Sequence, residues 1–359
     1  MRIGIIGRTA DGAQLFDGQT IKTRVLRDEL YRYVPGCEIT CVDTYNYKKR
    51  AVQTLSNTIK VLKESDCVFV LLSRNGCAVF FPILHWFNKI FKKPIYHDVI
   101  GGCFDEVMRS HPSWKKYINA FRVNWVELPS LERKLQDAGI RNAVTLPNFK
   151  RLPILRADEL SLNVPEVFEF CTFSRVVKTK GIVEAAEAVN YANAKAGKRI
   201  ARLHVYGEID ESFREQFEAL LENNKETVIY EGIAAPEKSV ENICKYFALL
   251  FPTTHPGEGF PGTFIDAFAA GVPIIASDWN YNAELIDEGV TGYCYPVSEP
   301  RMLNELVWNA CRTPEMVLNL KENCIKKAEQ YSPDYVMGVI CRQMREDGVL
   351  KTSEAESIV

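Results

Sequence analysis

The sequence has few features of an exported or membrane-spanning protein. No C-x-x-C pair occurs and the 11 cysteines are an odd number, so we expect reduced, mostly buried thiols and no disulfide framework. The runs without charge are too short to span a bilayer, and the opening residues lack the apolar segment of a secretory signal. We therefore expect a cytoplasmic protein, with a peripheral position at the inner face of a membrane left open.

The sequence also has no recognised nucleic-acid-binding module, so we expect no nucleic-acid partner. Its net charge is only -2, but the charge is unevenly distributed. Residues 1–150 carry 23 Lys and Arg against 14 Asp and Glu, whereas the remainder carries 21 against 32. This polarity predicts that the first part meets something anionic, such as a phosphorylated acceptor or a membrane surface.

The length of 359 residues exceeds what one hydrophobic core usually serves and predicts two domains. Short apolar runs alternate with segments of helical period, which predicts parallel sheets with crossover helices. The expected strands are residues 2–7, 39–43, 66–72, 94–98, 121–128 and 143–146, then 168–174, 202–207, 227–232, 247–252 and 272–277.

The boundary between the two domains is expected in the proline-rich segment 147–165. We therefore predict a first domain over residues 1–150 and a second over 151–332. Residues 333–359 are expected to form a final amphipathic helix and a tail, and this helix is a candidate to cross back to the first domain.

The stretch "HPGEGFPGTFIDAFAAG" lies between two expected strands and contains a helix that starts near Pro261. Backbone amides at such a helix start form an anion site suited to phosphate. Two carboxylates, of Glu258 and Asp266, would flank that phosphate; they repel it but accept hydrogen bonds from sugar hydroxyls. A sugar nucleotide offers both groups. The amides concerned belong to Gly259, Phe260, Gly262 and Thr263.

A different reading of the same glycines is a dinucleotide-binding turn. Gly257, Gly259 and Gly262 spell G-x-G-x-x-G, and Asp278 follows Gly257 by 21 residues at a strand end. This alternative is an NAD(P)-binding oxidoreductase. Against it, residues 253–256 separate the strand from the first glycine, where the fingerprint requires the turn to follow directly.

The stretch "EGFPGTFIDAFAAGVPIIASD" resembles the E-x7-E segment of the retaining glycosyltransferases of family 4 (group 1). Similarity extends to "FSRVVKTKG", "LHVYG", "VIYEG" and "ELIDEGVTGYCYP", and more thinly to "DGQTIKTRVLRDEL", "KPIYHD" and "LPN". The resemblance implies an α/β chain of the GT-B fold, with two Rossmann-like, doubly wound parallel-sheet domains facing across a cleft. Asp266 stands where the family usually has glutamate.

The resemblance implies a retaining hexosyltransferase that moves a sugar from a nucleotide-sugar donor to a saccharide or lipid-linked glycan, in polysaccharide or glycoconjugate biosynthesis. A UDP-sugar is favoured over a GDP-sugar. Glu258 would contact the donor sugar and Asp266 the ribose, while Arg175 and Lys180 would close on the pyrophosphate. Each residue also has a structural alternative. Glu258 would then be a solvated loop acid, and Asp266 an acid that complements the helix dipole. Arg175 and Lys180 would be exposed basic residues at a turn.

Two further residues of the first half take roles from the resemblance. Gly18 would let the backbone approach the phosphates, although a plain turn glycine is the alternative. His97, at the end of an expected strand, would contact the donor sugar, and its alternative is a hydrogen-bonded strand-end residue.

No D-x-D triplet occurs, and metal-dependent transferases commonly use one. Arg175, Lys180 and the helix-start amides would stabilise the leaving phosphate without a metal, and we expect no cofactor besides the donor. A nucleotide-sugar epimerase on the same fold and a binding scaffold without turnover remain alternatives.

The stretch "AVFFPILHWFNKIFKKP" combines bulky apolar residues with Lys89, Lys92 and Lys93. It predicts either a buried helix with a basic end or a seat on anionic lipid near a lipid-linked acceptor.

Overall fold

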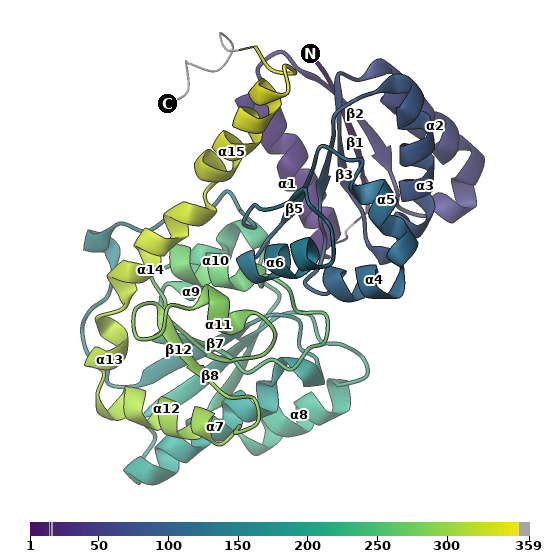
Figure 1. Cartoon of the computed structure of the whole chain (residues 1–359). Helices are drawn as coiled ribbons and strands as arrows, with labels where there is room; N and C mark the ends of the chain where they lie inside the picture. The colour runs from purple at the N-terminus through teal and green to yellow at the C-terminus, as the bar shows by residue number, and fades with distance from the viewer. Residues whose placement is uncertain (14, 16, 352–359) are drawn as a thin grey trace. The chain divides into compact units, whose positions relative to one another are not determined.

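The protein forms two compact α/β units in a computed structural model that describes residues 1–13, 15 and 17–351 (Figure 1). The first unit comprises Met1–Arg151 and the segment from Pro333 onward, and the second comprises Leu152–Ser332. Each contains one six-stranded sheet flanked by helices.

The sheet of the first unit has the strand order β2-β1-β3-β4-β5-β6, and all its pairings are parallel. Its strands are β1 (Arg2–Gly7), β2 (Glu38–Asp43), β3 (Cys67–Leu71), β4 (Ile95–Asp98), β5 (Val123–Val126) and β6 (Ala143–Thr145). Its helices are α1 (Gly18–Tyr33), η1 (Tyr47–Arg50), α2 (Ala51–Glu64), α3 (Arg74–Phe91), α4 (Phe104–Ser110), η2 (Pro112–Trp114), α5 (Lys115–Ile118), α6 (Pro129–Asp137) and α15 (Pro333–Glu346).

Helix α15 belongs to the first unit, where it lies beside α1 (Figure 1). Its apolar residues recur every three or four positions, so one face of the helix is apolar. Val336, Met337, Ile340 and Met344 are buried in one core with residues of β1, β3 and α1. The chain end is also tied by polar contacts, because the Tyr96 hydroxyl donates to Asp347 Oδ2 at 2.9 Å.

The sheet of the second unit has the order β12-β11-β10-β7-β8-β9 and is also parallel throughout. Its strands are β7 (Phe168–Phe173), β8 (Ala201–Tyr206), β9 (Val228–Gly232), β10 (Ala248–Phe251), β11 (Ile274–Ser277) and β12 (Gly292–Tyr295). Its helices are η3 (Ala157–Glu159), η4 (Lys178–Lys180), α7 (Ile182–Ala196), α8 (Arg214–Asn223), η5 (Pro236–Lys238), α9 (Ser239–Ile243), α10 (Gly262–Ala269), α11 (Asn282–Leu285), α12 (Met302–Arg312), α13 (Glu315–Leu318), α14 (Lys321–Ala328) and η6 (Glu329–Tyr331).

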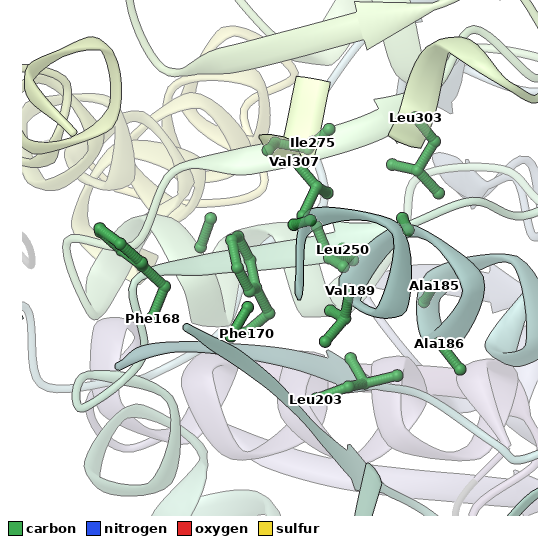
Figure 2. Close-up of a cluster of buried hydrophobic side chains, with 14 of the residues drawn as sticks. Phe168, Phe170, Ala185, Ala186, Val189, Leu203, Leu250, Ile275, Leu303 and Val307 are labelled. Carbon is green, nitrogen blue, oxygen red and sulfur yellow. The ribbon is translucent and has the colours of Figure 1, made fainter. Parts of the chain in front are cut away.

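The core of the second unit lies where α7 and α12 cover one face of this sheet (Figure 2). Small side chains of α7, such as Ala185 and Ala186, let the helix approach the strands closely. Phe170, Leu203 and Leu250 from three strands fill the space beneath, which fixes the position of the sheet's central strands.

Among residues 1–13, 15 and 17–351, no helix combines the length and the apolar character needed to cross a bilayer. Every strand expected from the sequence is present, and β12 was not expected.

Candidate functional site

The order of the second sheet reverses between β7 and β10, and the chain leaves both strands at the same edge. Open parallel sheets bind ligands at such a switch point. The two loops that follow are in contact there, since the Thr254 N–H donates to the Thr179 carbonyl at 2.8 Å. Gly181 makes this approach possible: its φ is +72°, and a Cβ would lie 2.2 Å from the Pro252 carbonyl oxygen.

Lys180 and Glu258, one from each loop, form an ion pair at this edge. Their side chains are both only 10% exposed, so the pair is largely removed from water. Glu258 Oε2 also accepts a hydrogen bond from the Thr253 hydroxyl at 3.1 Å, and Lys180 Nζ lies 5.2 Å from the centre of the Phe251 ring. The structure therefore brings together the cation and the acid that the sequence analysis singled out.

The loop that carries Glu258 is held by polar contacts that reach it from Thr179, Trp279 and Asn280. The Trp279 indole donates to the His255 carbonyl at 2.7 Å, and the Asn280 amide donates to the Glu258 carbonyl at 2.9 Å. The His255 ring bonds the Thr179 hydroxyl at 3.0 Å. The polar residues of "TTHP" indicate that this loop makes hydrogen bonds, but the sequence does not show which distant residues are their partners.

Arg175 lies exposed in the turn after β7. Burial lowers the pKa of His255, and the neighbouring charges of Lys180 and Arg175 lower it further, against the opposing effect of Glu258. Both predicted pyrophosphate-binding cations thus lie near enough to His255 to affect its pKa.

Helix α10 starts at Gly262 after Pro261, so the first helical N–H groups are those of Gly262 and Thr263. The Thr263 hydroxyl is buried and has no hydrogen-bond partner within the described part of the chain. The Phe260 ring packs edge-on against Tyr331, with ring centres 5.1 Å apart. Phe260 therefore anchors the turn through its side chain.

Asp266 lies one turn into α10 and is 2% exposed. Its Oδ1 accepts a hydrogen bond from the Ser239 hydroxyl at 2.9 Å. Ser239, the first residue of α9, could not be predicted from the sequence, because its distance from Asp266 along the chain gives no pattern.

His97 is fully enclosed in the first unit, between the rings of Phe81, Phe104 and Phe121. Its Nδ1 bonds Asn124 Oδ1 at 2.8 Å, and burial lowers its pKa to about 4. This geometry favours the reading of a hydrogen-bonded strand-end residue, and contact with a donor sugar stays a prediction.

Gly18 is the exposed first residue of α1. The preceding Asp17 caps the helix, because its Oδ1 accepts the Thr20 N–H at 3.3 Å. Approach of phosphate to Gly18 stays a prediction, as does the cleft between the domains.

A buried ion cluster that the sequence analysis missed lies at the carboxyl edge of the first sheet. Lys22 Nζ is 2.7 Å from Asp98 Oδ1 and 2.9 Å from Glu127 Oε1. Burial raises the pKa of Asp98 to about 6, although Lys22 opposes the shift. The cluster joins α1 to the ends of β4 and β5.

The dinucleotide-binding alternative does not fit this geometry. β10 ends at Phe251 and α10 begins at Gly262, so a long packed loop replaces the tight turn of the fingerprint. The Asp278 carboxylate accepts the Val297 N–H at 2.8 Å and so ties down the chain after β12.

Within the described part of the chain, no group of three or more His, Cys, Asp or Glu side chains is placed to hold a metal ion.

Residues 161–331 match the family model described as "Glycosyl transferases group 1". A stretch of 186 residues is 26% identical to poly(glycerol-phosphate) alpha-glucosyltransferase of Bacillus subtilis (strain 168). The match covers 50% of this chain and 26% of that protein, so the chain spans only about a quarter of its relative.

Solved structures that share the fold over most of the chain include two complexes of HepE and a sucrose-phosphate synthase. HepE of Anabaena in complex with UDP has a TM-score of 0.75 at 13% identity, covering 96% of this chain and 100% of that one. Sucrose-phosphate synthase from Thermosynechococcus elongatus has a TM-score of 0.70 at 16% identity, covering 96% and 99%. HepE in complex with UDP-glucose gives 0.71 at 13% identity, with the same coverage as the UDP complex. The predicted fold class, α/β with two Rossmann-like parallel sheets as in GT-B proteins, is confirmed.

Proposed function

We propose that this chain transfers a hexosyl group from a UDP-sugar to a saccharide or lipid-linked glycan acceptor. The match of residues 161–331 to the group 1 glycosyl transferase model and the GT-B-like fold support this proposal. The observation that carries the proposal is the Lys180–Glu258 ion pair at the switch point, beside the start of α10. The Lys180 ammonium group suits a diphosphate, and the Glu258 carboxylate suits a sugar hydroxyl.

In the proposed reaction the bond between the anomeric carbon and the diphosphate oxygen breaks, a bond from that carbon to an acceptor hydroxyl oxygen forms, and the hydroxyl proton passes to the leaving diphosphate. Negative charge then grows on the diphosphate, where Lys180, Arg175 and the amides at the α10 start would stabilise it. Positive charge grows on the sugar, which Glu258 would stabilise while its carboxylate holds a sugar hydroxyl. Since these cations and amides serve the leaving group, we propose that no metal is required.

Asp266 is proposed to bind the ribose together with Ser239. Aspartate is one methylene shorter than the glutamate usual at this position in the family that the segment resembles. The Ser239 hydroxyl donates a hydrogen bond to one oxygen of the Asp266 carboxylate, which restricts the orientation of that side chain.

UDP as the nucleotide is supported by HepE, whose structures hold UDP and UDP-glucose. A phosphate-bearing acceptor is supported by the name of the Bacillus relative and by the positive charge of residues 1–150. We further propose retention of the anomeric configuration and a role in polysaccharide or glycoconjugate biosynthesis.

The test is release of UDP from UDP-glucose, UDP-galactose and UDP-N-acetylglucosamine in EDTA, with and without poly(glycerol phosphate) or short glycans. We expect release that depends on an acceptor, with an α-linked product by NMR. Conversion of the donor without an acceptor would show an epimerase, and reduction of NAD(P) would show an oxidoreductase. Either result, or no turnover with any pair, would refute the proposal.

A further inference from the structure

Helix α3 presents an apolar face to solvent in addition to the face it buries. Phe80, Phe81 and Leu84 pack inward, whereas the opposite face exposes Val79 (39%), Trp86 (60%) and Ile90 (71%). Spacings of seven and four residues place these three side chains on one side of the helix. The inward face fits the interpretation of this stretch as a buried helix with a basic end, and the exposed face is the one that bears on the alternative of a seat on anionic lipid.

Cations surround this exposed face. Lys89 Nζ lies 4.1 Å from the centre of the Trp86 ring, and Lys92 and Lys93 directly follow the helix. No Asp or Glu occurs from Arg74 to Lys93. Burial lowers the pKa of His85 and the charges of Lys89 and Lys116 lower it further, so α5 adds to the same positive field.

A hollow of about 450 Å³ opens beside the C-terminal end of α3. It is lined by Lys92, Lys93 and Arg122, with Asp347 as its one acidic residue. The Asp347 carboxylate is already engaged, since it pairs with Arg122 and accepts the Tyr96 hydroxyl. The remaining positive charge and the size of the hollow suit a phosphate headgroup.

We propose that the α3 patch, defined as Trp86, Lys89, Ile90, Lys92, Lys93 and Arg122, binds the surface of an anionic phospholipid bilayer. Trp86 and Ile90 insert at the headgroup level, where an indole ring with one wet edge is favoured. The lysines pair with lipid phosphates beside the Arg122–Asp347 ion pair. Charge complementarity selects this occupant, because an apolar partner would leave the surrounding cations without counter-charges. The inference does not depend on the proposed catalytic activity.

Co-sedimentation with vesicles tests this, using phosphatidylglycerol mixed with phosphatidylcholine against phosphatidylcholine alone. We expect the chain to bind the mixed vesicles and to leave them in high salt. Lys89→Gln with Lys93→Gln should weaken binding by about 25-fold, at roughly fivefold for each lysine. Trp86→Ser with Ile90→Ser should weaken it by about tenfold or more.

The matched control is Lys198→Gln with Lys225→Gln, which removes the same charge from exposed sites of the second unit and should bind as the unchanged chain does. Equal binding to both kinds of vesicle, or equal loss in the patch and control variants, would overturn the proposal. Sedimentation velocity covers the other occupant: self-association abolished by the Trp86 and Ile90 changes would show that a second copy covers the patch.

Discussion

Lys180 and Glu258 form an ion pair whose side chains are both 10% exposed. Each charge therefore stabilises the charged form of the other in a largely buried site. A diphosphate beside Lys180 would add negative charge near Glu258. Changes at these two residues should therefore affect nucleotide binding and turnover differently.

For Glu258→Gln we expect turnover to fall by about 100-fold or more, because the developing charge on the sugar loses its carboxylate. UDP affinity should stay equal or rise slightly, since a negative charge near the phosphates is removed. UDP-release kinetics and calorimetric titration measure the two effects. Glu222→Gln, on exposed α8, is the control. A loss of UDP affinity that matches the loss of turnover would contradict this role.

Replacing Lys180 with methionine should weaken UDP binding by about tenfold to 100-fold, the value of a charge-assisted hydrogen bond. It should also lower the free energy of unfolding, because Glu258 is left without its cation. Lys178→Met serves as the control, since Lys178 is exposed in the same turn. Both effects are measured by titration and urea denaturation. The assignment fails if the two variants bind UDP equally.

His97 should make the first unit acid-sensitive. Its pKa is lowered from 6.5 to about 4, so the unfolded chain takes up a proton at a higher pH than the folded chain. Stability therefore falls as the pH drops from 6.5 toward 4, by about 2–3 kcal/mol from this residue. Urea denaturation across this range should show a shallower pH slope for His97→Gln than for the unchanged chain or His111→Gln. An unchanged slope would contradict the buried, neutral ring.

At the scale of elements, α7 begins and ends at a glycine with positive φ, and only one of the two positions is crowded. Gly181 faces the Pro252 carbonyl, whereas a Cβ on Gly197 (φ +66°) would meet open space.

Alanine at Gly197 should therefore cost only the conformational strain, about 1 kcal/mol. Alanine at Gly181 should lower the free energy of unfolding by more than this, because its Cβ would clash with the Pro252 carbonyl. The clash should also displace the loop that carries Glu258 and so weaken UDP binding. Thermal unfolding and UDP titration of the two variants provide the measurement. Equal losses of UDP affinity in both would show that contact between the two loops does not shape the site.

The sequence predicted most elements because alternating apolar runs and helix-boundary residues are local signals. The sequence did not predict β12, because this strand has only four residues, begins with glycine and lies at a sheet edge. The start of α10 was predicted within one residue, since Pro261 and Gly271 mark its ends. Ser239 and Trp279 could not be predicted, because their contacts join loops that only the finished sheet brings together.

At the scale of the whole molecule, the last helix stabilises the unit in which the chain begins. Met337 is fully buried in the core of that unit. Met337→Ala should lower the free energy of unfolding of the first unit by about 2–5 kcal/mol and leave the stability of the second unit unchanged. Arg342→Ala, exposed on the same helix, is the control. Hydrogen exchange read by mass spectrometry assigns the loss to a unit, and reduced protection within Leu152–Ser332 would contradict the assignment of α15.

We propose above all that one edge of the second sheet binds a nucleoside diphosphate and its sugar together. The decisive experiment is calorimetric titration of the unchanged chain and of Lys180→Met with UDP, UDP-glucose, GDP and NAD in EDTA. We predict that UDP and UDP-glucose bind the unchanged chain without metal and that the Lys180 variant binds both more weakly. Binding of NAD alone, or no binding of any nucleotide at millimolar concentration, would contradict the claim.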